Sequence, residues 1–367
     1  MLIEICEDVV VLAENNDSDS ITVLEKIAMA HRYGKHFVYA SFPVLIRLCK
    51  MQSLNKFTRK IYSDIKKHHA SSGTLASAIG FRVKVTIASP PASASINYIQ
   101  FNPKLVSGFE LYEETHLLAE NLLDCSFFEY IVEYYKRSMG INSPVCFYPM
   151  QGGGDTIKMV YLNEIQLRQH FCLAIMDSDK KYPQGALGDT CKGLKRIHRQ
   201  YNPFHCFYYI MENTREVENL IPLSVVKSYN NNSNKQIFRD NIDVDFSFFD
   251  MKEGLLSCKI VGDIYTYWTS QLSVYTGLNE QLSECSGCVS HSNPRPTEND
   301  CEEVCDCRRI IEGFGSKLLD NLHRDNDSKE RLKNVEEHHL SNAQKTEWHA
   351  IGKLIFEWCC ASSAMRT

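Results

Sequence analysis

Acidic side chains in the middle of the chain are the residues best suited to chemistry. They are Glu120, Asp155, Asp177 and Asp179. Carboxylates that gather at one place repel each other unless a cation compensates their charge. Hard oxygen ligands of this kind suit Mg²⁺ or Mn²⁺, and two such ions can activate a water and stabilise a leaving oxygen in phosphodiester cleavage. The first expectation is therefore a magnesium or manganese site.

Three predicted strands would bring these acids together. The apolar run Phe171 to Met176 predicts a buried strand that ends just before Asp177. The runs LLA and CFYPMQ predict two more, the first ending at Glu120 and the second at the glycines 152–154. Strands that alternate with helical stretches indicate a parallel sheet, whose strand ends share one edge. Because side chains alternate along a strand, Asp177 and Asp179 are expected to point the same way. The alternative is an ordinary acidic loop after a strand.

These motifs, in this order, resemble the TOPRIM domain of topoisomerases, bacterial primases and OLD-type nucleases. That family has a Glu after its first strand, a glycine turn after its second and Asp-x-Asp after its third. The segment REVEN, Arg215 to Asn219, is similar to a motif of OLD-like TOPRIM proteins in bacterial anti-phage defence. The resemblance covers roughly residues 112–225. It implies an α/β fold with a Rossmann-like parallel sheet and a Mg²⁺-dependent nuclease activity.

The resemblance also implies roles for individual acids. Asp177 and Asp179 would bind metal, and Glu120 would be a ligand or the general base. Glu216 or Glu218 would complete a second metal site. These implied ligands are Glu120, Asp124, Asp177, Asp179, Glu216 and Glu218.

Other readings stay open for some of these residues. Asp124 is a metal ligand or a cap at the start of a helix. Arg215 would pair with the acids and hold their geometry, which competes with a direct metal role for Glu216 and Glu218. Lys180 would meet the charge of the scissile phosphate or would be a solvated loop lysine.

The chain departs from the family pattern in two respects. Asn121 stands where a glycine usually follows the Glu, and we expect it to take a left-handed backbone in the glycine's place. The phosphate-binding motif GxxxxGK[ST] of the ATPase half is missing from the sequence. If ATP is used, a partner protein would have to supply it.

Composition sets the broader limits. The chain has 367 residues, of which 44% are hydrophobic and 23% charged, and its formal net charge is −5. These values fit a globular protein whose nucleic-acid binding must be local. We find no signal peptide and no apolar run long enough for a membrane span. Fifteen cysteines without a signal peptide indicate a cytoplasmic protein.

Two further stretches predict binding sites. Lys192, Lys195, Arg196 and Arg199 form a basic segment that would follow a nucleic-acid backbone, or would be a solvated face. Cys285, Cys288, Cys305 and Cys307, with Cys301 as a substitute, have spacings that fit a structural Zn²⁺. Unpaired thiols are the alternative to zinc.

The predicted organisation has three parts. Residues 1–110 would form an α+β extension that docks a regulatory partner, residues 111–225 the TOPRIM domain, and residues 226–367 a helical region with the cysteine cluster 285–307. The expected function is a Mg²⁺-dependent nuclease acting on DNA or RNA, an effector of anti-phage defence controlled by a partner. A homo-oligomer is left open. The alternative is a non-cleaving TOPRIM-like subunit that binds nucleic acid or an assembly partner.

Overall fold

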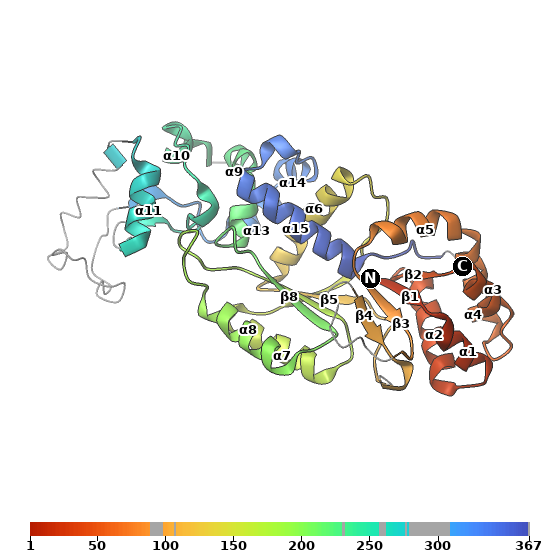
Figure 1. The fold of residues 1–367 in the computed structure, drawn as a ribbon. Coiled ribbons are helices and arrows are strands. Elements are labelled where there is room, and N and C mark those ends of the chain that lie inside the picture. Colours follow the sequence, from red (N-terminus) through yellow and green to blue (C-terminus); the bar gives the residue numbers. More distant parts are fainter. Residues whose placement is uncertain are drawn as a thin grey trace. The chain divides into compact units, whose positions relative to one another are not determined.

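The computed structural model describes residues 1–88, 98–105, 108–229, 232–256, 262–275, 277–278 and 309–365 (Figure 1). The chain forms two compact units. The first consists of Met1–Ile175, Gly193–Tyr209 and His349–Thr367, and the second of Met176–Lys192 and Ile210–Trp348. The three predicted domains remain a prediction, because their boundaries follow sequence patterns and these units are discontinuous in sequence.

The first unit begins with a four-stranded parallel sheet. Its order is β2-β1-β3-β4, and every neighbouring pair is parallel. The strands are β1 (Leu2–Ile5), β2 (Phe37–Ala40), β3 (Arg82–Val85) and β4 (Tyr98–Phe101). Parallel strands need crossover connections, and helices provide most of them here. They are α1 (Glu7–Glu14), α2 (Ser18–Arg32), α3 (Phe42–Lys50), α4 (Lys56–Lys67) and α5 (His69–Ala78).

The expected α+β extension is therefore wrong in class, because this part of the chain is α/β. Strands β1 and β2 have four residues each, which is too short for periodicity to separate them from helix. Helix α2 is capped by Asp17, whose side chain accepts a hydrogen bond from the Ser20 N–H. Helices α3 and α4 are separate, and the Asn55 side chain caps the second of them.

A second four-stranded sheet in the order β6-β5-β7-β8 carries the predicted motifs. Its strands are β5 (Thr115–Ala119), β6 (Phe147–Gln151), β7 (Cys172–Met176) and β8 (Cys206–Ile210). Strand β5 pairs in parallel with both β6 and β7. Its helices are α6 (Leu122–Ser138), α7 (Ile157–Leu167) and α8 (Asp189–Tyr201). The predicted α/β class with a Rossmann-like parallel sheet is thus confirmed.

Position in this sheet explains the composition of its strands. All five residues of β7 are buried, as expected of a strand with neighbours on both sides. Strand β6 lies at an edge and tolerates Pro149, which cannot donate a ladder hydrogen bond. The Cys172 N–H donates to the His205 carbonyl and the Met211 N–H to the Met176 carbonyl, so β7 and β8 run in the same direction.

A late segment of the chain completes the first unit. The Thr115 hydroxyl donates to the carbonyl of Trp358 at 2.6 Å. The Cys146 N–H donates to the Cys359 carbonyl, and Val145 and Cys360 form an isolated antiparallel bridge. Residues near position 360 are therefore part of the framework around β5 and β6.

The second unit is mostly helical and contains a two-stranded antiparallel sheet, β9 (Gly254–Leu256) with β10 (Arg309–Glu312). Its described α-helices are α9 (Leu223–Ser228), α10 (Gln236–Arg239), α11 (Gly262–Leu272), α13 (Leu318–Arg324), α14 (Asn326–Lys333) and the start of α15 (Asn342–Cys359), which belongs to the first unit from His349 onward. Short 3-10 turns are η3 (Val217–Leu220), η4 (Asn232–Asn234), η5 (Phe246–Phe248) and η8 (Glu337–His339). The predicted helical region is largely confirmed. The proposed zinc ligands Cys285, Cys288, Cys305 and Cys307 lie outside the described residues.

Candidate functional site

The Asp-x-Asp segment and the REVEN segment are bonded to each other in the second unit. The Val217 N–H donates to Asp177 Oδ1 at 3.0 Å, and the Asp179 N–H donates to the Arg215 carbonyl at 3.0 Å. Between them, the Ser178 hydroxyl donates to the Thr214 carbonyl at 2.6 Å. Two motifs that lie far apart in sequence therefore form one local structure directly after β7.

The two aspartates are placed differently from the expectation. Strand β7 ends at Met176, and Asp179 has a φ of 57°, which is left-handed backbone. Strand alternation therefore does not apply to them, although Asp tolerates this conformation better than most residues. Gly188 makes the close approach possible, because a Cβ atom added there would lie 2.1 Å from Asp179 Oδ2. Asp177 is half-buried and Asp179 is exposed.

Glu216 and Glu218 are buried and share one cation, Lys252. The Lys252 Nζ lies 3.2 Å from Glu216 Oε2 and 3.2 Å from Glu218 Oε1, and each glutamate side chain is 9% exposed. Glu216 also accepts a hydrogen bond from the Met251 N–H at 3.1 Å. Burial, together with the nearby Glu218, raises the pKa of Glu216 to about 7. Glu216 can therefore exchange a proton near neutral pH.

The charge of Lys252 is stabilised by its surroundings. Burial alone would lower the pKa of this lysine, but Glu216, Glu218 and Asp177 outweigh burial and hold the pKa above its usual value. Lys252 thus provides the positive charge that the acids require. Sequence reasoning missed it, because it lies in a short turn after an aromatic segment and no motif marks it.

The Arg and Asn of REVEN have structural roles. The Arg215 guanidinium lies 2.7 Å from the carboxylate of Asp250, so its direct ion pair is with Asp250 and not with Glu216 or Glu218. Asn219 Oδ1 accepts the Glu216 N–H, and its Nδ2 donates to the carbonyls of two nearby phenylalanines, 246 and 249. These contacts fix the backbone that carries the two glutamates.

Glu120 and Asp124 lie in the first unit. Glu120 follows β5 directly and is exposed, and its carbonyl accepts the Gly153 N–H at 2.8 Å. Asp124 is buried and joins a capping box, because Asp124 Oδ2 accepts the Asn121 N–H while Asn121 Oδ1 accepts the N–H groups of residues 123 and 124. Asp124 therefore helps to cap α6 as the third helical residue, but the N-cap itself is Asn121 and not Asp124.

The expected left-handed backbone at Asn121 is wrong. Its φ is −139°, and it serves as the N-cap of α6. Asn is among the best N-cap residues because its side-chain oxygen satisfies the first free N–H groups of a helix. Asn121 therefore has a capping role that a glycine could not perform with a side chain.

The remaining predicted residues have defined environments. The Lys180 Nζ lies 3.2 Å from the Glu212 carbonyl and 3.4 Å from Glu212 Oε2, and the residue is 9% exposed. This ammonium is held by the segment that follows β8. The predicted basic residues lie on α8, where all but Lys195 are exposed; they are Lys192, Lys195, Arg196 and Arg199. Lys192 pairs with Asp189 at 2.9 Å.

The acids of the second unit do not form a ready metal cage. Within the residues that the structure describes, they make no group of three or more whose ligand atoms all lie within 4.8 Å of one another. Lys252 explains part of this separation of the carboxylates, because it forms ion pairs with Glu216 and Glu218. Metal binding there would require side chains to move.

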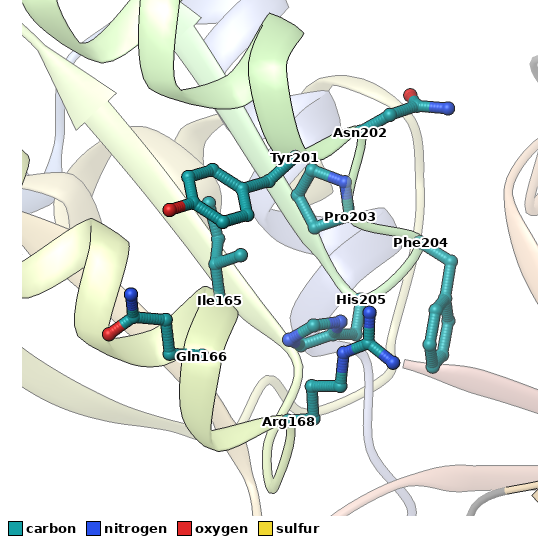
Figure 2. A pocket seen from close by; sticks show the side chains of 8 residues that line it. All are labelled: Ile165, Gln166, Arg168, Tyr201, Asn202, Pro203, Phe204 and His205. Carbon is teal, nitrogen blue, oxygen red and sulfur yellow. The ribbon is translucent and has the colours of Figure 1, made fainter.

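A separate cavity of about 260 Å³ lies in the first unit, between the end of α7 and the segment that leads into β8. Figure 2 shows the side chains that line it, which include Arg168, Tyr201 and His205. The imidazole of His205 is buried, and its Nε2 lies 3.2 Å from the Glu164 carbonyl. No sequence-predicted site residue lines this cavity.

In the described part of the chain, no helix combines the length and apolar character that crossing a membrane requires. Comparison with protein-family models, with curated proteins and with solved structures gave no match to this chain.

Proposed function

We propose that this chain is a metal-dependent TOPRIM-type nuclease that cleaves nucleic-acid phosphodiesters. One observation carries the proposal: Asp177-x-Asp179 and REVEN are hydrogen-bonded to each other at the end of a central parallel strand. In open α/β sheets this is the end where ligands bind. Control by a regulatory partner, such as an ATPase, and a role against phage follow from the family resemblance alone.

The chemistry of the side chains fits a hard divalent ion. Asp177, Asp179, Glu216 and Glu218 offer carboxylate oxygens, which Mg²⁺ and Mn²⁺ prefer. When bound, the ion would supply Lewis acidity toward a phosphoryl oxygen. Lys252 would neutralise negative charge in the absence of the ion and would have to release its glutamates when the ion binds.

Side chains of the protein would accept the proton of the attacking water and contact the nucleic acid. If Asp177, Asp179 and Glu218 hold the ion, Glu216, with its pKa of about 7, would be left to accept a proton from the attacking water. The exposed side chains of Lys192, Arg196 and Arg199 on α8 would contact phosphates of the nucleic acid. Arg215 and Asn219 would keep Glu216 in place through the contacts described above.

The test uses purified full-length protein with supercoiled plasmid and with tRNA, in Mg²⁺, Mn²⁺ or EDTA. We expect Asp177→Asn to reduce cleavage by about 100-fold or more, because a neutral amide is a poor ligand for a divalent ion. Asn can still accept the Val217 N–H, so the fold is retained. Asp240→Asn is the matched control, since Asp240 has a 46% exposed side chain, pairs with Arg239 and belongs to none of the predicted sites.

Cleavage that persists at the same rate in Asp177→Asn would show that this site is not the catalytic one. The ion pairs of Lys252 with both Glu216 and Glu218 favour a second candidate, a non-cleaving subunit in which the acids only stabilise the fold. That candidate gains support if no substrate is cleaved with any metal while α8 still binds nucleic acid.

A further inference from the structure

A second group of ligand-type side chains lies in the first unit, away from the predicted acids. It consists of His116, Glu164 and His170, whose ligand atoms all lie within 4.8 Å of one another. The His116 Nδ1 is 2.9 Å from Glu164 Oε2. The rings of His116 and His170 stack with their centroids 4.2 Å apart and an interplanar angle of 26°.

The fold brings these residues together from three elements. His116 is the second residue of β5, Glu164 lies on α7, and His170 comes just before β7. Strands β5 and β7 pair in parallel, with His116 opposite Cys172. The cluster therefore lies near the amino ends of these strands, whereas Glu120 follows the carboxyl end of β5. It is independent of the proposed nuclease site.

A cavity of about 350 Å³ opens beside the two imidazoles. His116 and His170 line it, while Glu164, whose side chain is 5% exposed, lies behind them. The lining also includes three glutamates, Glu110, Glu113 and Glu114. Glu110 and Glu114 pair with Lys26 and Lys35, respectively. Carboxylates thus line the cavity through which a cation would reach the imidazoles.

The electrostatics leave His170 suitable as a ligand. Burial, together with the neighbouring His116, lowers the pKa of His170, which favours the neutral imidazole. A neutral imidazole has a lone pair for a metal, whereas a protonated one has none. Glu164 is buried beside His116, which suits a carboxylate that shares its charge with a cation.

We propose that His116, Glu164 and His170 form a binding site for a zinc-class divalent transition metal. Two imidazoles and one carboxylate are a known protein donor set for Zn²⁺ with one position left open. Ligand atoms about 2 Å from a tetrahedral metal lie about 3.3 Å apart, so small side-chain movements complete the site. The open position faces the cavity, where a water would bind.

The experiment is a metal titration of the full-length protein after dialysis against EDTA. Calorimetry with Zn²⁺ counts the bound equivalents, and Co²⁺ absorption reports the ligand types. We expect His170→Ala and Glu164→Gln to lose one equivalent, or to bind it about 100-fold or more weakly. We also expect Zn²⁺ to raise the Tm of the stripped wild-type protein by about 5 °C and that of these variants by less.

Two further variants keep the test decisive. His170→Cys retains a ligand, so it should keep the equivalent and add a thiolate-to-cobalt absorption band. His198→Gln is the matched control, because His198 is half-buried on α8 and contacts the Tyr161 hydroxyl. Zinc bound by cysteines elsewhere would remain in every variant. Two outcomes would overturn the proposal: equal numbers of equivalents in the wild type and in His170→Ala, or a folded His170→Cys with no thiolate band beyond that of the wild type.

Discussion

Replacement of Lys252 by Met should reveal how strongly Glu216 and Glu218 depend on this cation. At an effective dielectric constant of about 20, two unit charges 3.2 Å apart attract each other by about 5 kcal/mol. Desolvation opposes this attraction, and the Lys252 side chain is 35% exposed, so solvent screens part of the rest. We expect Lys252→Met to lower the free energy of unfolding by about 2–3 kcal/mol at pH 8.

The loss should depend on pH in a defined direction. The pKa of Glu216 is raised from its ordinary 4.5 to about 7, so between these values the folded protein binds this proton more tightly than the unfolded chain. The contribution of Glu216 to stability therefore falls as the pH rises from 4.5 through 7, by about 3 kcal/mol in all. Lys252 lowers this pKa, so its removal raises the pKa further. At pH 5 Glu216 is protonated in both proteins, and the penalty of Lys252→Met should be smallest there.

Urea unfolding at pH 5 to 8, followed by tryptophan fluorescence, measures this difference. Trp268 and Trp348 lie in the second unit and report on its unfolding. Lys235→Met is the matched control, because Lys235 pairs with Glu312 at 3.3 Å on the surface, with side chains 30% and 48% exposed. We expect it to change stability by less than about 0.5 kcal/mol. If Lys252→Met is as mild as this control at pH 8, or costs most at pH 5, the electrostatic account is wrong.

Two other substitutions test the framework of the same site by the same unfolding measurement. Gly188→Ala should lower the free energy of unfolding by about 1–3 kcal/mol, because its new methyl group would collide with Asp179. The control Gly108→Ala should be nearly neutral, because a Cβ atom there would have no other atom within 4 Å. Asn219→Ala should lower the free energy of unfolding by about 2–4 kcal/mol, because it removes three hydrogen bonds to the backbone in the interior. The control Asn15→Ala removes a single hydrogen bond at an exposed position and should lower it by less than about 1 kcal/mol. If Gly188→Ala costs no more stability than Gly108→Ala, the packing role of Gly188 is wrong. If Asn219→Ala costs no more than Asn15→Ala, the hydrogen-bonding role of Asn219 is wrong.

Local signals in the sequence predicted the second sheet well. The apolar run before Asp177 became the fully buried β7, because a central strand of a parallel sheet is covered on both faces. The order of strand ends followed from the alternation of strands and helices. Strands β1 and β2 were missed because four residues carry too little periodicity.

Contacts between distant segments could not be predicted in the same way. Lys252 reaches Glu216 and Glu218 through folding of the second unit, and no spacing in the sequence relates them. His116 and Glu164 meet for a similar reason, since β5 and α7 become neighbours only in the folded first unit. At Asn121 the residue type was compatible with two local structures, and helix capping was favoured over a left-handed turn.

The discontinuous first unit has a consequence for the order of folding during synthesis. Its sheets are complete once residues up to Tyr209 have emerged, but Thr115 and Cys146 bond to backbone near Trp358 and Cys359. The groups on Thr115 and Cys146 therefore stay uncovered, with the apolar surface around them, until the segment around Trp358 and Cys359 has been synthesised. Such a waiting intermediate is the kind of species that binds chaperones and aggregates at high concentration. Translation speed through the second unit would then affect the yield of folded first unit.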